Sequence, residues 1–236
     1  MTNMVKSHRL PDGQPQQEIS AILNDVFQRL LAAYGPQHWW PGETPFEVMV
    51  GAILTQSAAW SNVEKAICNL KAKGLLTPAA LRNVALPLLA ETIRPSGYFN
   101  VKAKKLKELV NWLATYRDNI DLLRTGDLHD LRAELLSVYG VGEETADSIL
   151  LYACGRPMFV IDAYTVRVTG RLGITPEQRT YAGWQSHFME NLTNQVALFN
   201  EYHALLVIHG KNTCRKKPQC TGCCLSKICQ SSGHQS

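Results

Sequence analysis

Apolar residues recur at intervals of three and four along most of the chain, the spacing that places them on one face of a helix. The pattern predicts a helix from Ile19 to the residue before Gly35, and another from about Pro45 with Thr44 as its N-cap. Ser61 is expected to cap a third helix. No long stretch alternates with a period of two, so we expect an all-α fold.

The stretch from Leu135 to Arg171 combines a glycine turn, an apolar helix and an isolated acidic residue. Gly140 and Gly142 allow the backbone to turn sharply before the helix. Backbone N–H groups at such a turn suit a phosphate, although an ordinary helix corner has the same pattern. The next apolar run ends in Asp162, at the edge of a core. Because burying a charge is costly, an acid there needs partners or a function.

Length and composition are those of a globular protein. The chain has 236 residues, of which 45% are hydrophobic and 19% charged. Residues 1–17 are polar, and we expect a disordered tail without a signal peptide. No apolar run approaches the roughly 18 residues that span a bilayer. We expect a cytoplasmic monomer with no membrane partner.

The net charge of +4 is weak evidence for a nucleic-acid partner, but the charge is unevenly distributed. No acidic residue follows Glu201. Five basic residues do, namely Lys211, Arg215, Lys216, Lys217 and Lys227. A second basic group is Lys102, Lys104, Lys105 and Lys107. Both groups are either solvated faces or contacts to phosphates.

Two further features suggest chemistry. Trp39 and Trp40 are neighbours in a loop, where they serve as core staples or as a wall on which an extruded base stacks. Five of the seven cysteines fall in the last 23 residues, and in a cytosolic protein such clustering favours a metal site over disulfides. Cys68 and Cys154 stand on apolar helical faces and are expected in the core.

Four of the clustered cysteines, Cys214, Cys220, Cys223 and Cys229, have the spacing C-x5-C-x2-C-x5-C. Four thiolates suit a [4Fe–4S] cluster or tetrahedral zinc.

The residues LLSVYGVGEETADSIL and VIDAYTVRV resemble the helix-hairpin-helix motif and downstream aspartate of the endonuclease III (HhH-GPD) superfamily of DNA glycosylases. The resemblance implies two helical lobes with damaged double-stranded DNA bound between them. It implies that Asp162 is catalytic and that Gly140, Gly142 and Thr145 bind DNA. Gln56, in ILTQSAAW, matches a residue that fills the space left by a flipped nucleotide in relatives.

Relatives carry the motif C-x6-C-x2-C-x5-C around a [4Fe–4S] cluster, and the first spacing here is one residue shorter. The resemblance implies that the four spaced cysteines bind such a cluster and that Cys224 does not. Arg215, Lys216 and Lys217 lie in the loop that presents cations to the DNA backbone in relatives.

Bifunctional relatives carry a lysine in the helix after the hairpin, and this chain has Glu144 at that position. Because a glutamate cannot form an imine, the chain resembles the monofunctional members. The motifs WWP, DAYT and EYHALLVIHGK are most similar to bacterial 3-methyladenine DNA glycosylases. This similarity implies a base pocket formed by Trp39, Trp40 and Lys211.

We therefore expect a bacterial, monofunctional DNA glycosylase of base excision repair that flips out alkylated purines such as 3-methyladenine and hydrolyses their N-glycosidic bond. Two alternatives remain: a bifunctional glycosylase and AP lyase for oxidised pyrimidines, and a non-catalytic Fe–S lesion sensor. The expected domains are a six-helix barrel with the hairpin at 44–152, and a second domain of 18–43 and 153–236 with the cluster loop.

Overall fold

The computed structural model describes residues 15–40 and 42–232. The α-helices are α1 (Pro15–Tyr34), α2 (Pro45–Leu54), α3 (Trp60–Ala72), α4 (Pro78–Asn83), α5 (Leu86–Thr92), α6 (Phe99–Ala114), α7 (Leu128–Ser137), α8 (Glu143–Ser148), α9 (Ala163–Leu172), α10 (Tyr181–Met189) and α11 (Val196–Asn212). Two 3-10 turns, η1 (Arg94–Ser96) and η2 (Ile120–Arg124), and a π-helical turn, η3 (Ile149–Ala153), add to these. The described residues contain no strand, which confirms the expected all-α fold. Within the same residues, no helix combines the length and apolarity needed to cross a membrane.

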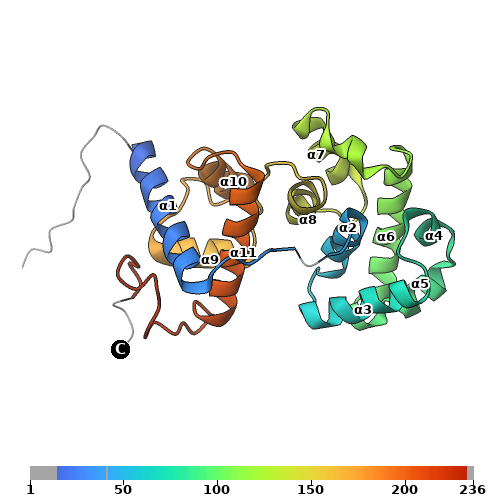
Figure 1. Cartoon of the computed structure of the whole chain (residues 1–236), viewed down its shortest axis with the longest axis horizontal. Helices are drawn as coiled ribbons and strands as arrows, with labels where there is room; N and C mark the ends of the chain where they lie inside the picture. Colours follow the sequence, from blue (N-terminus) through green and yellow to red (C-terminus); the bar gives the residue numbers. More distant parts are fainter. Residues whose placement is uncertain (1–14, 41, 233–236) are drawn as a thin grey trace, which may run out of the picture.

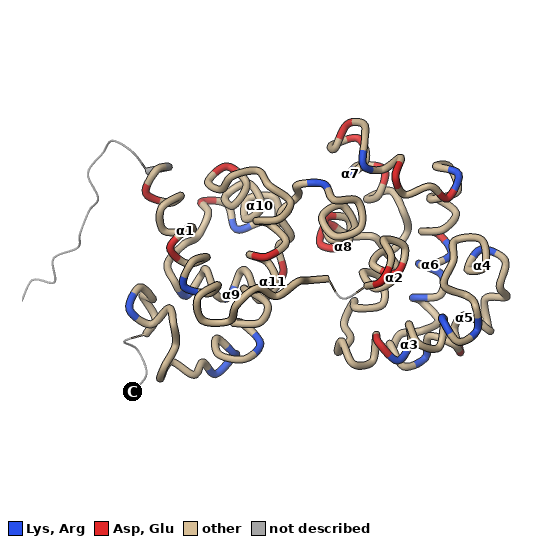
Figure 2. Tube along the Cα trace, in the orientation of Figure 1, with Lys and Arg blue, Asp and Glu red and all other residues tan. Residues whose placement is uncertain are grey.

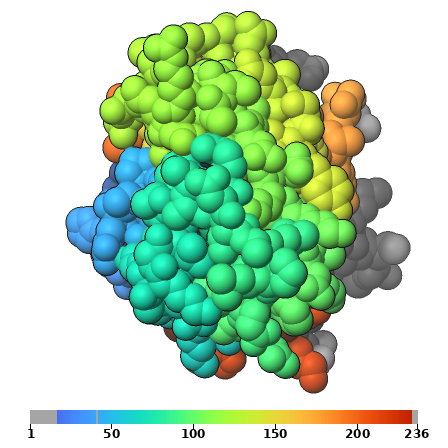
Figure 3. All heavy atoms as spheres, turned by 90° about the vertical axis from the view of Figure 1, so that its right-hand side faces the viewer, coloured from blue at the N-terminus to red at the C-terminus, as the bar shows by residue number. Residues whose placement is uncertain are grey.

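The buried apolar side chains form two separate clusters. One is built from α2 to α8 with η3, and the other from α1, α9, α10, α11 and the cysteine-rich segment. Figure 1 shows the corresponding lobes side by side, joined by segments 35–44 and 154–162. Seen from the end of the first lobe, its helices cover almost the whole face (Figure 3). We keep the division at residues 44 and 152 as a proposal, which the two clusters support.

Local capping signals account for some of the helix starts. The helix α2 begins at Pro45, and the Thr44 side chain accepts a hydrogen bond from the backbone N–H of the third helical residue, Glu47, as predicted. The prediction that Ser61 caps α3 is wrong. The chain is already helical at Trp60, and Ala59 is the N-cap, so Ser61 lies inside the first turn.

The helix α1 is longer than predicted. It begins at Pro15, four residues before Ile19, so residues 15–17 are helical and do not belong to a tail. Proline fits this first position because its fixed φ is helical and its missing N–H is not needed there. Residues 1–14, the rest of the predicted tail, lie outside the described residues, as do Pro41 of the WWP motif and residues 233–236. The helix ends before Gly35, whose φ of +69° is a left-handed conformation that glycine adopts without strain.

Most of the lysines of α6 are internal ties, which corrects the expectation of a solvated or phosphate-binding face. Lys102 is buried, and its Nζ donates to the carbonyls of Leu54 and Ser96, both at 2.7 Å. Burial lowers the pKa of Lys102 to about 8. Lys107 also donates to two backbone carbonyls, whereas Lys104 is exposed.

We predict that Lys102→Met lowers the free energy of unfolding by about 2 to 3 kcal/mol, because the carbonyls of Leu54 and Ser96 lose the buried ammonium donor. Urea unfolding at pH 7 measures the change. Lys104→Met, on the same helix, is the matched control and should change the value by less than about 0.5 kcal/mol. Equal effects of the two substitutions would contradict the assignment of Lys102 as a tie.

Candidate functional site

Asp162 lies at the end of segment 154–162, which joins the two lobes, and it is the N-cap of α9. The four preceding residues, 158–161, are buried, and the chain turns into α9 at the first polar residue after them. The Thr165 backbone N–H donates to Asp162 Oδ1 at 2.7 Å. The Asp162 side chain is only 11% exposed. The local sequence thus places a nearly buried carboxylate at a helix start.

The Asp162 carboxylate is ionised at neutral pH. Burial alone would raise its pKa, yet the net shift is downward because His203 and the Thr165 N–H favour the charged form. His203 Nε2 lies 3.7 Å from Asp162 Oδ2. Sequence analysis did not single out His203, although it lies within the EYHALLVIHGK match.

Glu144 and Asp162 line the same groove. Glu144 is in the first turn of α8, and Arg179, Tyr181 and Trp184 close the groove from the start of α10. The pKa of Glu144 is raised, first by the protein atoms around its carboxyl group and then by the charge of Asp162. The position that holds a lysine in bifunctional relatives therefore faces the candidate catalytic aspartate with a second carboxyl group.

An aromatic cluster lies behind Asp162. Trp40, joined to Trp39 by a cis peptide bond, packs with ring centroids 5.5 Å from Trp60 and 5.2 Å from Tyr152. The Tyr152 hydroxyl lies 2.5 Å from His203 Nδ1. Both tryptophans are partly buried, so they are packed and still reach the surface. Their role as a base pocket remains a proposal.

The hairpin is braced from within the first lobe. Gln56 Nε2 donates to the Gly140 carbonyl at 3.0 Å and to the Thr145 hydroxyl at 2.9 Å, while Lys105 donates to Gln56 Oε1 at 2.6 Å. Gly140 has a φ of +83°, and a Cβ there would overlap the Lys105 side chain. The structure thus brings together Gln56, Gly140 and Thr145. In this arrangement the Gln56 side chain is hydrogen-bonded to the hairpin.

A cationic groove runs beside the Asp162 groove and shares Ala163 and Arg167 with it. It is lined by the loop after α2 and by Tyr164, Arg167, Lys211, Arg215 and Lys216. Figure 2 shows basic residues gathered on the side of the second lobe that holds α9 and the cysteine-rich segment. Lys211 thus lies among the cations, in a groove that the two predicted pocket tryptophans do not line. Lys217 is exposed in the same loop.

Arg167 holds this groove together. Its guanidinium donates to the carbonyls of Gly210 and Cys214, both at 2.9 Å, and lies 5.0 Å from the centre of the Tyr164 ring. A Cβ on Gly210 would overlap that ring, so only glycine permits the contact. The helix α9 is thereby fixed against the end of α11.

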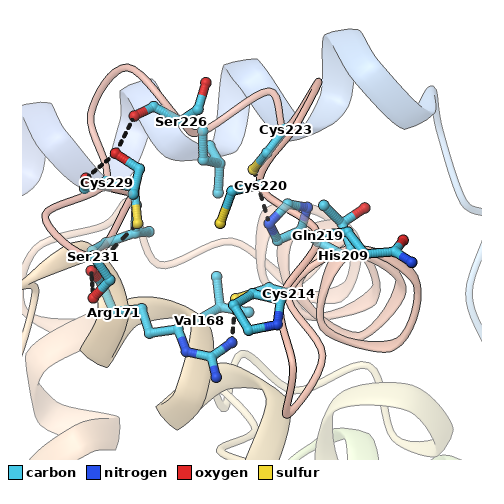
Figure 4. Close-up of a pocket in the computed structure, with 15 residues that line it drawn as sticks. Val168, Arg171, His209, Cys214, Gln219, Cys220, Cys223, Ser226, Cys229 and Ser231 are labelled. Carbon is cyan, nitrogen blue, oxygen red and sulfur yellow. Dashed lines mark hydrogen bonds between the residues drawn. The ribbon is translucent and has the colours of Figure 1, made fainter. Parts of the chain in front are cut away.

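Four cysteines line one cavity of the second lobe, and they are the four that were predicted as ligands: Cys214, Cys220, Cys223 and Cys229. Figure 4 shows their sulfur atoms around this space. Arg171, which sequence analysis missed, donates to Cys214 Sγ at 3.2 Å and to the carbonyls of Arg215 and Lys216. Sequence spacing alone gave no sign of this arginine.

The donor set fits a metal cluster. Four soft thiols converge on one cavity, while Cys224 is not among its lining residues. Among the described residues, no three His, Cys, Asp or Glu side chains are placed to hold a metal ion, so a bound cluster stays a proposal. Of the two cysteines predicted in the core, Cys154 is buried, but Cys68 is exposed on the outer face of α3 and that prediction is wrong.

Comparison with known proteins places this geometry in context. Residues 50–194 match the family described as HhH-GPD superfamily base excision DNA repair protein. A putative DNA repair glycosylase of Methanocaldococcus jannaschii is 48% identical over 212 residues, which cover 89% of this chain and 96% of that protein. An endonuclease III of Sulfolobus acidocaldarius is 28% identical over 78% of this chain and 81% of its own length. Because the first of these organisms is an archaeon, the comparison gives no support to the predicted bacterial origin.

Two solved structures are similar in fold. Endonuclease III trapped as a covalent intermediate with DNA has a TM-score of 0.78 at 23% identity, covering 91% of this chain and 97% of its own. The 3-methyladenine DNA glycosylase of Helicobacter pylori, bound to 1,N6-ethenoadenine, has a TM-score of 0.69 at 29% identity, covering 83% and 97%.

We predict that Cys220→Ser lowers the iron content and visible absorption of the purified protein, because it removes one of four thiols around the cavity. Cys224→Ser is the matched control and should retain both. Iron and sulfide analysis with absorption spectroscopy measures the difference. A protein that binds no iron in either form, or loses it equally in both, would contradict this ligand set.

Proposed function

The chain belongs to the HhH-GPD superfamily of base excision DNA repair proteins, as a DNA glycosylase, and from this premise we propose that it is a monofunctional enzyme for alkylated purines. It would flip out a base such as 3-methyladenine and hydrolyse the N-glycosidic bond, leaving an abasic site in damaged double-stranded DNA.

The observation that carries this proposal is the pair of carboxyl groups in one groove. Asp162 and Glu144 both line it, and among the described residues that line it none is a lysine. A lyase step needs an amine that attacks the sugar, and the groove offers carboxylates instead. This arrangement supports hydrolysis by water.

The substrate class follows from charge. An alkylated purine carries a positive charge before it leaves, and the sugar becomes positive as the bond breaks. An ionised Asp162 favours both. Aromatic rings lie near Asp162. Among them, the ring of Trp40 packs against that of Tyr152 and offers a stacking surface for a cationic base. The structural relative from Helicobacter pylori, a 3-methyladenine DNA glycosylase, supports the same class.

The proposed step conserves atoms and charge. The bond between C1′ and the base nitrogen breaks, its electron pair leaves with the base, and the cationic base departs neutral. Asp162 stabilises the positive charge at C1′ and orients a water molecule. The water oxygen bonds to C1′ and its proton passes through the Asp162 carboxylate to solvent. No external oxidant or reductant is needed.

The cysteine cavity would hold a [4Fe–4S] cluster through Cys214, Cys220, Cys223 and Cys229. A bound cluster would supply a covalent staple for the loop and no part of the hydrolysis. The chain's own contribution is clear from the contacts of Arg171, which tie the loop backbone at Arg215 and Lys216 to α9. The cations of the loop are thereby held at the edge of the cationic groove, where they would contact DNA phosphates.

A second candidate function is the bifunctional glycosylase and lyase. Lys211 is exposed in the cationic groove, which shares Ala163 and Arg167 with the Asp162 groove. A lyase mechanism would therefore use the Lys211 amine as its nucleophile. Borohydride trapping of the protein on lesion-containing DNA, with Lys211→Ala as the negative control, separates this function from hydrolysis.

We predict that Asp162→Asn slows base release at least about 100-fold while DNA affinity stays within about twofold, because the anion that stabilises the sugar is lost. Asparagine also caps a helix, so α9 is preserved. Single-turnover release of 3-methyladenine from a defined duplex measures the rate, and Asp130→Asn, exposed on α7, is the matched control. Full activity of Asp162→Asn would overturn the assignment.

We also predict that strand breaks on an alkylpurine duplex appear only after treatment with alkali. Glu144→Lys should place an amine in the groove and give a borohydride-trapped complex that the wild type does not give. Denaturing gels with and without alkali measure both results. Wild-type breaks without alkali, abolished in Lys211→Ala, would favour the bifunctional function instead.

A further inference from the structure

His203 on α11 is a buried polar residue whose ring is only half satisfied. The residue is 5% exposed. Its Nδ1 lies 2.5 Å from the Tyr152 hydroxyl. Its Nε2 has no hydrogen-bond partner within the described part of the chain and points at Asp162 Oδ2 from 3.7 Å. A buried donor without a partner carries a cost that a functional contact would remove.

The proton positions follow from the neighbours. Burial and the charges of Asp162 and Glu201 raise the pKa of Tyr152 well above its usual value, so its hydroxyl keeps its proton. That hydroxyl can donate to His203 Nδ1 only when Nδ1 is unprotonated. The ring proton is then on Nε2, facing the Asp162 carboxylate. The opposite tautomer would point a lone pair at an anion.

We propose that His203 is a positioning residue for catalysis, with its Nε2–H closing onto Asp162 Oδ2 when damaged DNA is bound, while Tyr152 holds the tautomer. This inference rests on the proposed function of Asp162. The two carboxylate oxygens then receive one donor each, the Thr165 N–H on Oδ1 and the His203 N–H on Oδ2. Hydrogen bonds in catalytic sites are often long without substrate and shorten in the complex.

The geometry also links the base to the acid. The Tyr152 ring lies 5.2 Å from that of Trp40 and 6.0 Å from that of His203. Two side chains, Tyr152 and His203, therefore connect Trp40 to Asp162. The titratable groups of this network are Tyr152 on η3, Asp162 before α9, Glu144 on α8 and Glu201 on α11.

The first experiment is a kinetic comparison of three variants with the wild type on a 3-methyladenine duplex. We expect His203→Ala to lower the single-turnover rate constant of base release about 100-fold, with DNA affinity nearly unchanged. Because Asp162 loses a donor that lowers its pKa, the acid limb of the rate profile should move to higher pH. His203→Gln, whose amide N–H reaches the same oxygen, should recover most of the rate. Tyr152→Phe should lower kcat less than His203→Ala.

The second experiment needs no substrate. An NMR titration of the Asp162 side-chain carboxyl, in wild type and in His203→Gln and His203→Ala, measures its pKa directly. We expect a rise in His203→Ala and little change in His203→Gln. If Asp162→Asn is inactive but His203→Ala keeps its rate and the Asp162 pKa, His203 does not position the acid and only this inference falls. If the wild type releases no alkylated purine, the proposed function falls, and the titration still decides on His203.

Discussion

The Asp162 carboxylate must stay ionised although it is almost completely buried, and contacts within the second lobe stabilise its charge. Asp162 is 11% exposed, and burial opposes its charge. The start of α9 offsets this through the Thr165 N–H and the positive end of the helix, and α11 offsets it through His203. The His203 contribution depends on how α9 and α11 pack, whereas Thr165 belongs to the helix that Asp162 caps.

That packing is fixed by contacts between α9 and the C-terminal end of α11. Arg167 ties α9 to the carbonyls of Gly210 and Cys214, and Tyr164 lies against the bare backbone of Gly210. One turn further along α9, Arg171 binds the backbone of the cysteine loop. A single helix thus carries the candidate catalytic acid at its start and orients the cations of the basic groove along its length. One rigid helix therefore positions the acid and the cations. This is why side chains between Asp162 and Arg171 bond to the backbone of neighbouring segments.

Features that depend on neighbours in sequence were predictable, and features that depend on distant partners were not. Thr44 caps the helix that starts at the next residue, and Asp162 ends an apolar run, so local sequence was enough to single out both. The buried partners of Lys102 come from residues 54 and 96, and those of Gln56 from the hairpin more than 80 positions away. Composition made Lys102 look like a surface charge. Apolar spacing likewise suggested a buried Cys68, but that position faces solvent.

The remaining charges near the hairpin distinguish Glu144 from the other acids of α8. Arg132 binds Asp147 at 2.7 Å and lies 3.7 Å from Glu143, so two of the three acids on α8 are offset by one guanidinium. Glu144 has no such partner in the described residues and turns to the groove with Asp162. Two arginines line the same groove, so its two carboxylates are balanced in number by two guanidinium groups. Under the proposed function, the basic groove beside it would hold the DNA backbone, and the two carboxylates would face the positively charged sugar and base.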